Sequence, residues 1–206
     1  MDTIAWALGL GYDYIAHSFL GGPLRLSEGV MTPWLEGLSR FDEGISADVA
    51  ALVRCLDDAA DVEVANSDFN NCMVTPVPGC FVPPYASVFL DPSKTLWGAV
   101  TSQVLSWYEQ AGLDWVGQSS RYPWLRAPDH IGVEFAFVAE QLSSAYAGSD
   151  IEINILQSAM LQHMRDWVPK YVLEMEQHVR ATYWRKMGEV LNSWVHINTF
   201  AISQRG

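Results

Sequence analysis

The sequence predicts an all-α fold, a single-domain bundle of about nine or ten helices, and three observations lead to this prediction. The chain has 206 residues, half of them apolar, which is enough for a substantial core. Apolar residues recur at steps of three and four along most of the chain, as on the buried face of a helix. No run of alternating apolar and polar residues outlasts these helical stripes. We therefore expect residues 1–206 to form one helical domain, without a sheet.

Prolines, glycines and capping residues divide the first half of the chain into three expected helices. The first covers about residues 3–20 and ends before the turn sequence "GGP". The second has Thr32 as its N-cap and Pro33 as its first helical residue. The third begins near Ser46. Residues 61–90 then contain four prolines and no sustained helical period, so we expect an irregular segment that is functional or mobile.

The second half resumes a helical pattern. A helix is expected from Asp91–Pro92 to Gly112, where glycine suits the C-terminal cap. After an irregular stretch, the next helix begins at Pro128–His130 and ends near Gly148. The sequence "SDIE" at 149–152 has the spacing of a capping box and opens another helix. Asp166 and Pro169 suggest that this helix breaks before a last one that runs from Val168 to Trp194.

Charge and hydropathy limit the classes of partner. The formal net charge is −12, and residues 1–80, with 3 basic and 12 acidic residues, carry −9 of it. This balance argues against nucleic acid, which needs clusters of Lys and Arg, and suits a basic peptide. No apolar run approaches the ~18 residues of a membrane span. Asp2 stands where a secretory signal would be positive, so we expect no signal peptide and no integral membrane segment.

The three cysteines, Cys55, Cys72 and Cys80, form no C-x-x-C motif and are odd in number. A disulfide framework is therefore not expected, and reduced thiols in the cytoplasm fit better.

The stretch "RAPDHIGVEF" at 126–135 places three polar groups, Asp129, His130 and Glu134, at the entrance of an expected helix. His130 and Glu134 are four residues apart and would share one helix face. They could form a metal half-site or an acid/base pair, they could line a binding pocket, or Asp129 could simply cap the helix. No E-x-x-H pair, H-E-x-x-H, P-loop or dinucleotide motif accompanies them. We therefore expect no metal and no organic cofactor.

Two segments resemble the TorD/DmsD family of redox-enzyme maturation chaperones. The sequences "PPYASVFLD" at 83–91 and "PDHIGVEFAFVAEQL" at 128–142 are similar to that family's P-(Y/W)-E-S-x-(Y/F) and E-P-x-D-H-(I/L)-x-x-E-(L/F)-x-F-(M/V) segments, which a helix separates. "LQHMRDWVPKY" further on resembles the family's H-x-x-x-W-x-P stretch. The chain departs from the pattern at Ala86 and at Arg126–Ala127.

The resemblance implies a TorD-like all-helical fold and a cytoplasmic chaperone. Such a chaperone binds the twin-arginine signal peptide of the apo form of a molybdopterin oxidoreductase and assists its folding, cofactor insertion and export proofreading. The implied peptide contacts are Tyr85, Ser87, Phe89, Pro128, Asp129, His130 and Glu134. Asp129 and His130 would lie at a groove edge as polar anchors above an apolar floor.

Two other readings stay open at this point. One is a small helical enzyme that uses Asp129, His130 and Glu134 at a pocket. The other is a helical scaffold subunit without a peptide groove. The sequence is compatible with a monomer or with a dimer formed by domain exchange.

Overall fold

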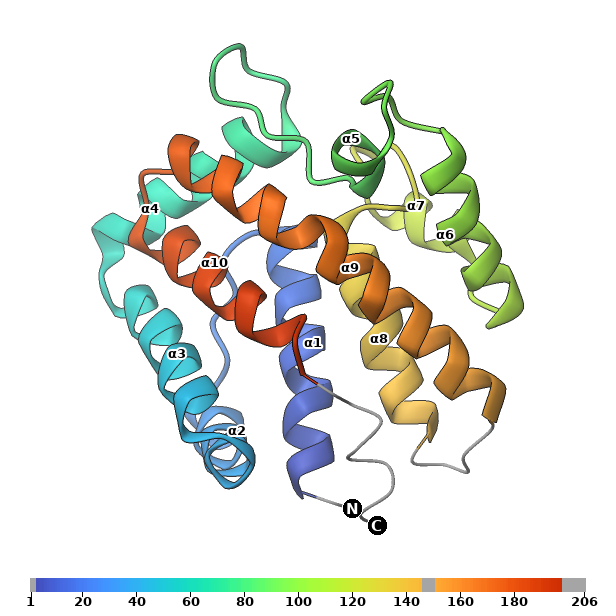
Figure 1. Cartoon of the computed structure of the whole chain (residues 1–206). Helices are drawn as coiled ribbons and strands as arrows, with labels where there is room; N and C mark the ends of the chain where they lie inside the picture. Colours follow the sequence, from blue (N-terminus) through green and yellow to red (C-terminus); the bar gives the residue numbers. More distant parts are fainter. Residues whose placement is uncertain (1–2, 146–150, 198–206) are drawn as a thin grey trace.

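A computed structural model describes residues 3–145 and 151–197. These residues form ten α-helices, a 3-10 turn and a π-helix, with no β-strand among them, which confirms the all-α prediction (Figure 1). None of the helices in these ranges is both long and apolar enough to cross a membrane. The α-helices are α1 Thr3–Gly21, α2 Glu28–Phe41, α3 Glu43–Arg54, α4 Ala59–Asp68, α5 Ala86–Leu90, α6 Ala99–Gln110, α7 Trp115–Arg121, α8 Ile131–Ala145, α9 Ile151–His178 and α10 Thr182–Trp194; the 3-10 turn η1 is Cys55–Asp57 and the π-helix η2 is Phe69–Val74.

Helix α1 lies in the middle of the bundle and confirms the first expected helix (Figure 1). It packs along α8 and also contacts α2 and α10. Leu8, Tyr12 and Phe19 are almost fully buried on it. At Gly11, the indole ring of Trp194 occupies the space that a side chain would need, so only glycine allows this close approach of α1 and α10.

Helices α2 and α3 both begin earlier than the sequence suggested. Ser27 is the N-cap of α2, and its carbonyl oxygen accepts the first backbone bonds, so Thr32 is not the cap and Pro33 lies inside the helix. The side chain of Asp42 accepts a hydrogen bond from the backbone N–H of Ile45 at 3.0 Å and thereby caps α3.

The prediction of an irregular segment over 61–90 was wrong for its first half. Helix α4, capped by Asp58 through the N–H of Ala60, continues directly into η2. Ala65, Phe69 and Cys72 are buried along this helical run. Within 61–90, only residues 75–85, which hold all four prolines, lack a helix, and α5 follows them.

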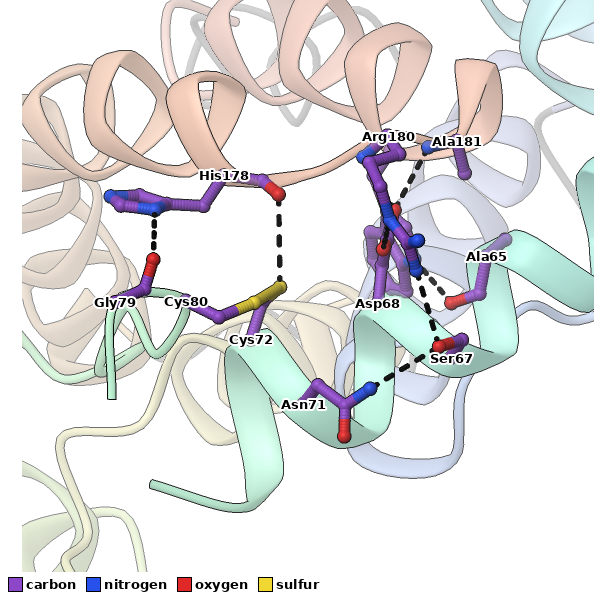
Figure 2. The surroundings of a disulfide bond; sticks show 11 residues. Ala65, Ser67, Asp68, Asn71, Cys72, Gly79, Cys80, His178, Arg180 and Ala181 are labelled. Carbon is purple, nitrogen blue, oxygen red and sulfur yellow. Dashed lines mark hydrogen bonds and ion pairs between the residues drawn. A yellow bond between two sulfur atoms is a disulfide. The ribbon is translucent and has the colours of Figure 1, made fainter. Parts of the chain in front are cut away.

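The expected disulfide-free state was also wrong. The sulfur atoms of Cys72 and Cys80 are bonded, with their Cα atoms 5.0 Å apart, while Cys55 is free and half-buried (Figure 2). The pairing depends on a loop that folds back, because the N–H of Val82 donates to the carbonyl oxygen of Cys72 at 2.7 Å. The imidazole of His178 lies within 3.2 Å of the carbonyl oxygen of Gly79 and connects this loop to α9.

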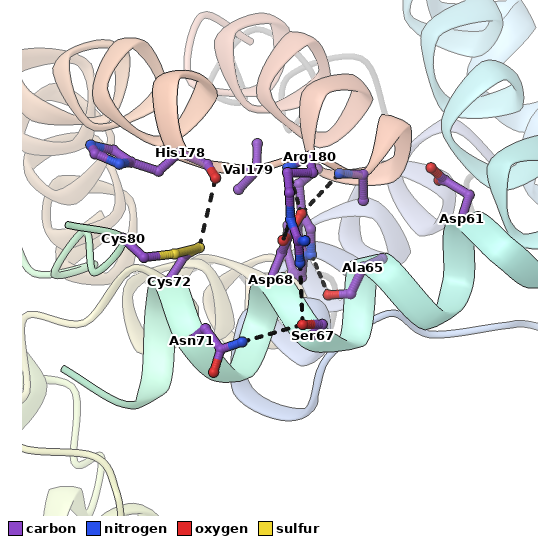
Figure 3. Close-up of polar contacts among 12 residues, drawn as sticks. Asp61, Ala65, Ser67, Asp68, Asn71, Cys72, Cys80, His178, Val179 and Arg180 are labelled. Atoms are coloured by element: carbon purple, nitrogen blue, oxygen red, sulfur yellow. Dashed lines mark hydrogen bonds and ion pairs between the residues drawn. A yellow bond between two sulfur atoms is a disulfide. The ribbon is translucent and has the colours of Figure 1, made fainter. Parts of the chain in front are cut away.

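The expected break near Pro169 does not occur, because α9 runs through that residue to His178. The chain breaks instead at 179–181. The carboxylate of Asp68 accepts hydrogen bonds from the N–H groups of Arg180 at 2.6 Å and Ala181 at 2.8 Å (Figure 3). Asp61 accepts those of Thr182 and Tyr183, so two carboxylates of α4 satisfy the free N–H groups at the start of α10.

The other helix boundaries differ from the predicted ones by a few residues or more. Helix α6 begins at Ala99 instead of 91–92, and the short helix α7 lies in a stretch expected to be irregular. Gly112, with a φ of +71°, follows the end of α6 as expected. Of the expected capping box, residues 149 and 150 lie outside the described part of the chain, and α9 begins at Ile151.

Candidate functional site

The two segments singled out in the sequence meet in space. Tyr85 and His130 form an isolated antiparallel bridge. Its two backbone bonds run from the N–H of Ala86 to the carbonyl oxygen of Asp129 and from the N–H of Ile131 to that of Pro84, both 2.9 Å long. The structure therefore brings together residues that are more than forty positions apart in the chain.

Asp129 is fully buried and connects three elements. One carboxylate oxygen accepts the backbone N–H of Ser87, near the start of α5, at 2.7 Å. The other accepts the hydroxyl of Thr101 in α6 at 3.1 Å, and the Thr101 hydroxyl oxygen accepts the N–H of Trp97. Asp129 thus caps α5 from across the bridge, whereas the expected cap was on its own helix. Sequence reasoning missed Thr101, for which the local pattern holds no signal.

His130 caps α8. Its Nδ1 atom accepts the backbone N–H of Gly132 at 3.1 Å, which places the proton of the neutral ring on Nε2. The Nε2 atom has no hydrogen-bond partner among the described residues. The ring is fully buried against the edges of Tyr85 and Trp124, at centroid distances of 5.0 and 5.3 Å. Burial lowers the pKa of His130 to about 3, so the ring is neutral at physiological pH.

Glu134 faces α9. One carboxylate oxygen lies 3.0 Å from Nε2 of His163, and the other accepts the indole N–H of Trp167 at 3.0 Å. Burial raises the pKa of Glu134, and its bonds to His163 and Trp167 oppose that rise. Burial by itself would lower the pKa of His163, but the adjacent carboxylate outweighs this and raises it. His163 was not among the predicted site residues, although the His-x-x-x-Trp spacing, which puts both side chains on one helix face, was a usable signal.

The placement of Asp129 and His130 at a groove edge was wrong, because both side chains are completely buried. Tyr85, Ser87, Pro128 and Glu134 are buried as well. Phe89 is half-buried and packs on Trp167 and Tyr171. A direct peptide-binding role for these seven residues stays a prediction, and in the structure they join α5, α6, α8 and α9. Within the described ranges, no three His, Cys, Asp or Glu side chains are grouped in a way that could hold a metal ion.

An open groove of about 690 Å³ lies on another side of α8. It is lined by residues of α1 and α8, by the end of α7 and by the turn after α6. Trp6 and Leu10 add apolar surface, and Asp13, Glu140 and Gln141 add oxygen atoms. The lining residues are Ala5, Trp6, Gly9, Leu10, Asp13, Ala16, His17, Leu20, Ala111, Gly112, Leu113, Arg121, Tyr122, Ala136, Ala139, Glu140, Gln141, Leu142 and Ser143.

The buried network and the groove are neighbours. Glu134 and the groove residues Ala136, Ala139 and Ser143 lie on opposite faces of α8, because successive residues turn by about 100° around a helix. The ring of Trp124, which packs on His130, also contacts the ring of Tyr122 at a centroid distance of 6.1 Å. The network therefore supports one wall of the groove.

The chain was compared with models of known families. Residues 38–172 match the family described as nitrate reductase delta subunit. The matched range contains η2, the bridge between Tyr85 and His130, and the whole of α8. No curated protein matches the chain.

Proposed function

The chain belongs to the nitrate reductase delta subunit family, which implies a molybdoenzyme maturation chaperone, and we propose that it binds the twin-arginine signal peptide of its client. The client is the apo form of a molybdopterin oxidoreductase catalytic subunit, held in the cytoplasm until its cofactor has been inserted. The family match carries the proposal, and it agrees with the resemblance to the TorD/DmsD chaperones.

The charge and surface of the protein support a basic, partly apolar ligand. The net charge of −12 attracts a leader that begins with two arginines. The groove beside α8 combines apolar side chains with two carboxylates, as such a leader requires. The alternative of an enzyme has less support, because Asp129, His130 and Glu134 are all buried and hydrogen-bonded to different elements.

The test is calorimetric titration with the leader peptide of a molybdoenzyme encoded beside this protein. We expect saturable binding of the twin-arginine leader and weaker binding of the same peptide with both arginines replaced by alanine. Light scattering of the same samples distinguishes a monomer from a domain-exchanged dimer. If the folded protein binds neither peptide, the proposed function is wrong and the scaffold alternative takes its place.

A further inference from the structure

The disulfide between Cys72 and Cys80 is a feature that neither the proposed function nor the buried network uses. Cys72 lies in η2 and Cys80 in the proline-rich stretch after it, eight positions further along the chain (Figure 2). A disulfide stabilises a fold chiefly by restricting the unfolded chain, and the gain grows with the length of the closed loop. A ring this short contributes less to the bundle than a bridge between distant helices would, so its effect is concentrated on the residues that it encloses.

Hydrogen bonds hold the same loop independently of the sulfur atoms. The N–H of Val82, which is fully buried, donates to the carbonyl oxygen of Cys72 at 2.7 Å. On the other side, Nδ1 of His178 lies 3.2 Å from the carbonyl oxygen of Gly79 (Figure 2). These contacts remain when the S–S bond is broken. They keep the two cysteines close together, so the bond can form again without refolding of the protein.

The reduced state also has a hydrogen-bond partner in place. The Sγ atom of Cys72 lies 3.9 Å from the carbonyl oxygen of His178, the last residue of α9 (Figure 3). Carbonyl groups at the end of a helix have no partner within the helix. A disulfide sulfur carries no hydrogen atom, so this contact becomes a hydrogen bond only when Cys72 is a thiol. The fold thus accommodates Cys72 in both oxidation states.

The two sulfur atoms differ in their access to solvent. Cys72 is 1% exposed, whereas Cys80 is half-buried and follows the exposed residues Pro78 and Gly79. Exchange requires an incoming thiolate to reach one sulfur atom of the disulfide. A small thiol therefore attacks Cys80, and Cys72 is the leaving group.

In the cytoplasm, small thiols keep most cysteines reduced, and the disulfides found there are usually transient and serve catalysis or redox sensing. We propose that Cys72 and Cys80 form a reversible thiol–disulfide exchange site that reacts with a small thiol such as glutathione. The oxidation state of the pair sets how firmly residues 75–81 are held against η2 and α9. The cytoplasmic location rests on the proposed function, whereas the exchange site rests on the contacts of the two cysteines.

Reduction proceeds in two exchange steps. A small thiolate attacks Sγ of Cys80, the bond to Cys72 breaks, and a mixed disulfide forms at Cys80 while Cys72 leaves as a thiolate and takes up a proton. A second thiolate attacks the small-molecule sulfur of the mixed disulfide and releases Cys80, which also takes up a proton. The protein gains two electrons and two protons, and two small thiols become one small disulfide. That small disulfide is the oxidant when the steps run in reverse.

The first test measures the oxidation state of each cysteine. The full chain is equilibrated with mixtures of reduced and oxidised glutathione, quenched, alkylated and mapped by mass spectrometry. We expect Cys72 and Cys80 to change together and reversibly between disulfide and thiol in the folded protein. A structural disulfide would resist reduction by glutathione. Circular dichroism should show the same helical content in both states.

Amide hydrogen exchange measures the effect on the loop. The N–H groups of Cys80 and Phe81 both donate to the carbonyl oxygen of Val77, at 3.1 and 3.0 Å. We expect them to exchange about tenfold faster in the reduced protein, because the disulfide no longer restrains local opening. The N–H groups of Arg180 and Ala181, which bind a carboxylate of α4, serve as an internal control and should not change (Figure 3).

Three variants test the assignment of the two sulfur atoms. Cys80→Ser should show the fast exchange of the reduced protein in every buffer. Cys55→Ser, which removes the free and half-buried cysteine, is the matched control and should respond like the wild type. In oxidised glutathione, Cys72→Ala should accumulate a glutathione adduct on Cys80, whereas Cys80→Ser should not acquire one on the buried Cys72.

The proposal is overturned if both cysteines stay free in oxidised glutathione, or if the disulfide is reduced only when the protein unfolds. Equal amide exchange of Cys80 and Phe81 in the oxidised and reduced wild type would also overturn it, whether or not the variants fold. None of these measurements uses a leader peptide, so their failure leaves the proposed function standing. Absence of leader binding would in turn leave the exchange site standing.

Discussion

Acid should destabilise this protein through His130. In the folded state its ring is fully buried, its Nδ1 atom is occupied by the N–H of Gly132, and burial lowers its pKa to about 3. In the unfolded chain the pKa returns to about 6.5, so the unfolded state binds a proton between these two values and the folded state does not. The free energy of unfolding must therefore fall as the pH falls below 6.5.

The size of the effect follows from the difference between the two pKa values. Each pH unit below 6.5 costs about 1.4 kcal/mol, which gives about 2 kcal/mol at pH 5 and about 3 kcal/mol at pH 4. These losses are a large part of the ~5–15 kcal/mol that stabilise a typical domain. Protonation of Nδ1 would also break the hydrogen bond from Gly132 that caps α8, so the folded protein cannot bind this proton without losing the cap.

The assay is urea denaturation of the wild type and of His130→Asn, followed by circular dichroism between pH 4 and pH 8. Asparagine retains an acceptor suited to a helix N-cap but cannot titrate. We expect the variant to be less stable at pH 8 and to lose less stability on acidification than the wild type. His196→Asn, at an exposed position, serves as the control and should follow the wild-type profile. Parallel pH profiles for the wild type and His130→Asn would refute the reasoning.

Three further predictions test the packing and the buried network. Asp129→Ala leaves two buried donors unpaired and should lower the free energy of unfolding by about 2–5 kcal/mol at pH 7 in urea denaturation. Gly11→Ala should destabilise by about 1–3 kcal/mol in the same assay, because the new methyl group collides with Trp194, whereas Gly9→Ala should stabilise by about 0.5–1 kcal/mol through helix propensity. The raised pKa of His163 adds stability that is complete below about pH 6.5 and is lost as the pH rises through the folded value, so denaturation between pH 6 and 9 should show a flatter profile for His163→Gln.

Apolar periodicity predicted the helices whose packing is decided within one stretch of chain, such as α1 and α8. It failed at 61–74, a stretch without a sustained helical period that was grouped with the proline-rich residues after it. In the structure Asn66 and Asn70 donate to the carbonyl oxygens four residues earlier, at 2.8 Å each, on the exposed side of α4 and η2. Such residues are compatible with turns and with solvent-facing helix positions, and only the buried stripe beside them decides between the two.

The break between α9 and α10 could not be predicted for a different reason. Val179, Tyr183 and Met187 continue the helical stripe, so the local pattern favours an uninterrupted helix. The break is stabilised by Asp61 and Asp68, more than one hundred positions away, which accept the backbone hydrogen bonds of residues 180–182. Their carboxylates replace the backbone acceptors that a continuous helix would have provided. A capping group supplied by a distant helix leaves no signal at the site that it caps.

Partners that are distant in the sequence also explain what could and could not be predicted about the site. The two segments with family resemblance do come together, but the partners of Asp129 lie 28 and 42 positions away, so its burial could not be deduced. Ala86, where the family pattern has Glu, is completely buried and donates its N–H to the carbonyl oxygen of Asp129, a place with no room for an unpaired carboxylate. The replacement of Glu by Ala86 therefore affects the bridge between residues 84–86 and 129–131, at the start of α8. The groove lies on the opposite face, so the residues that would select a client can change without disturbing the bridge that holds the fold.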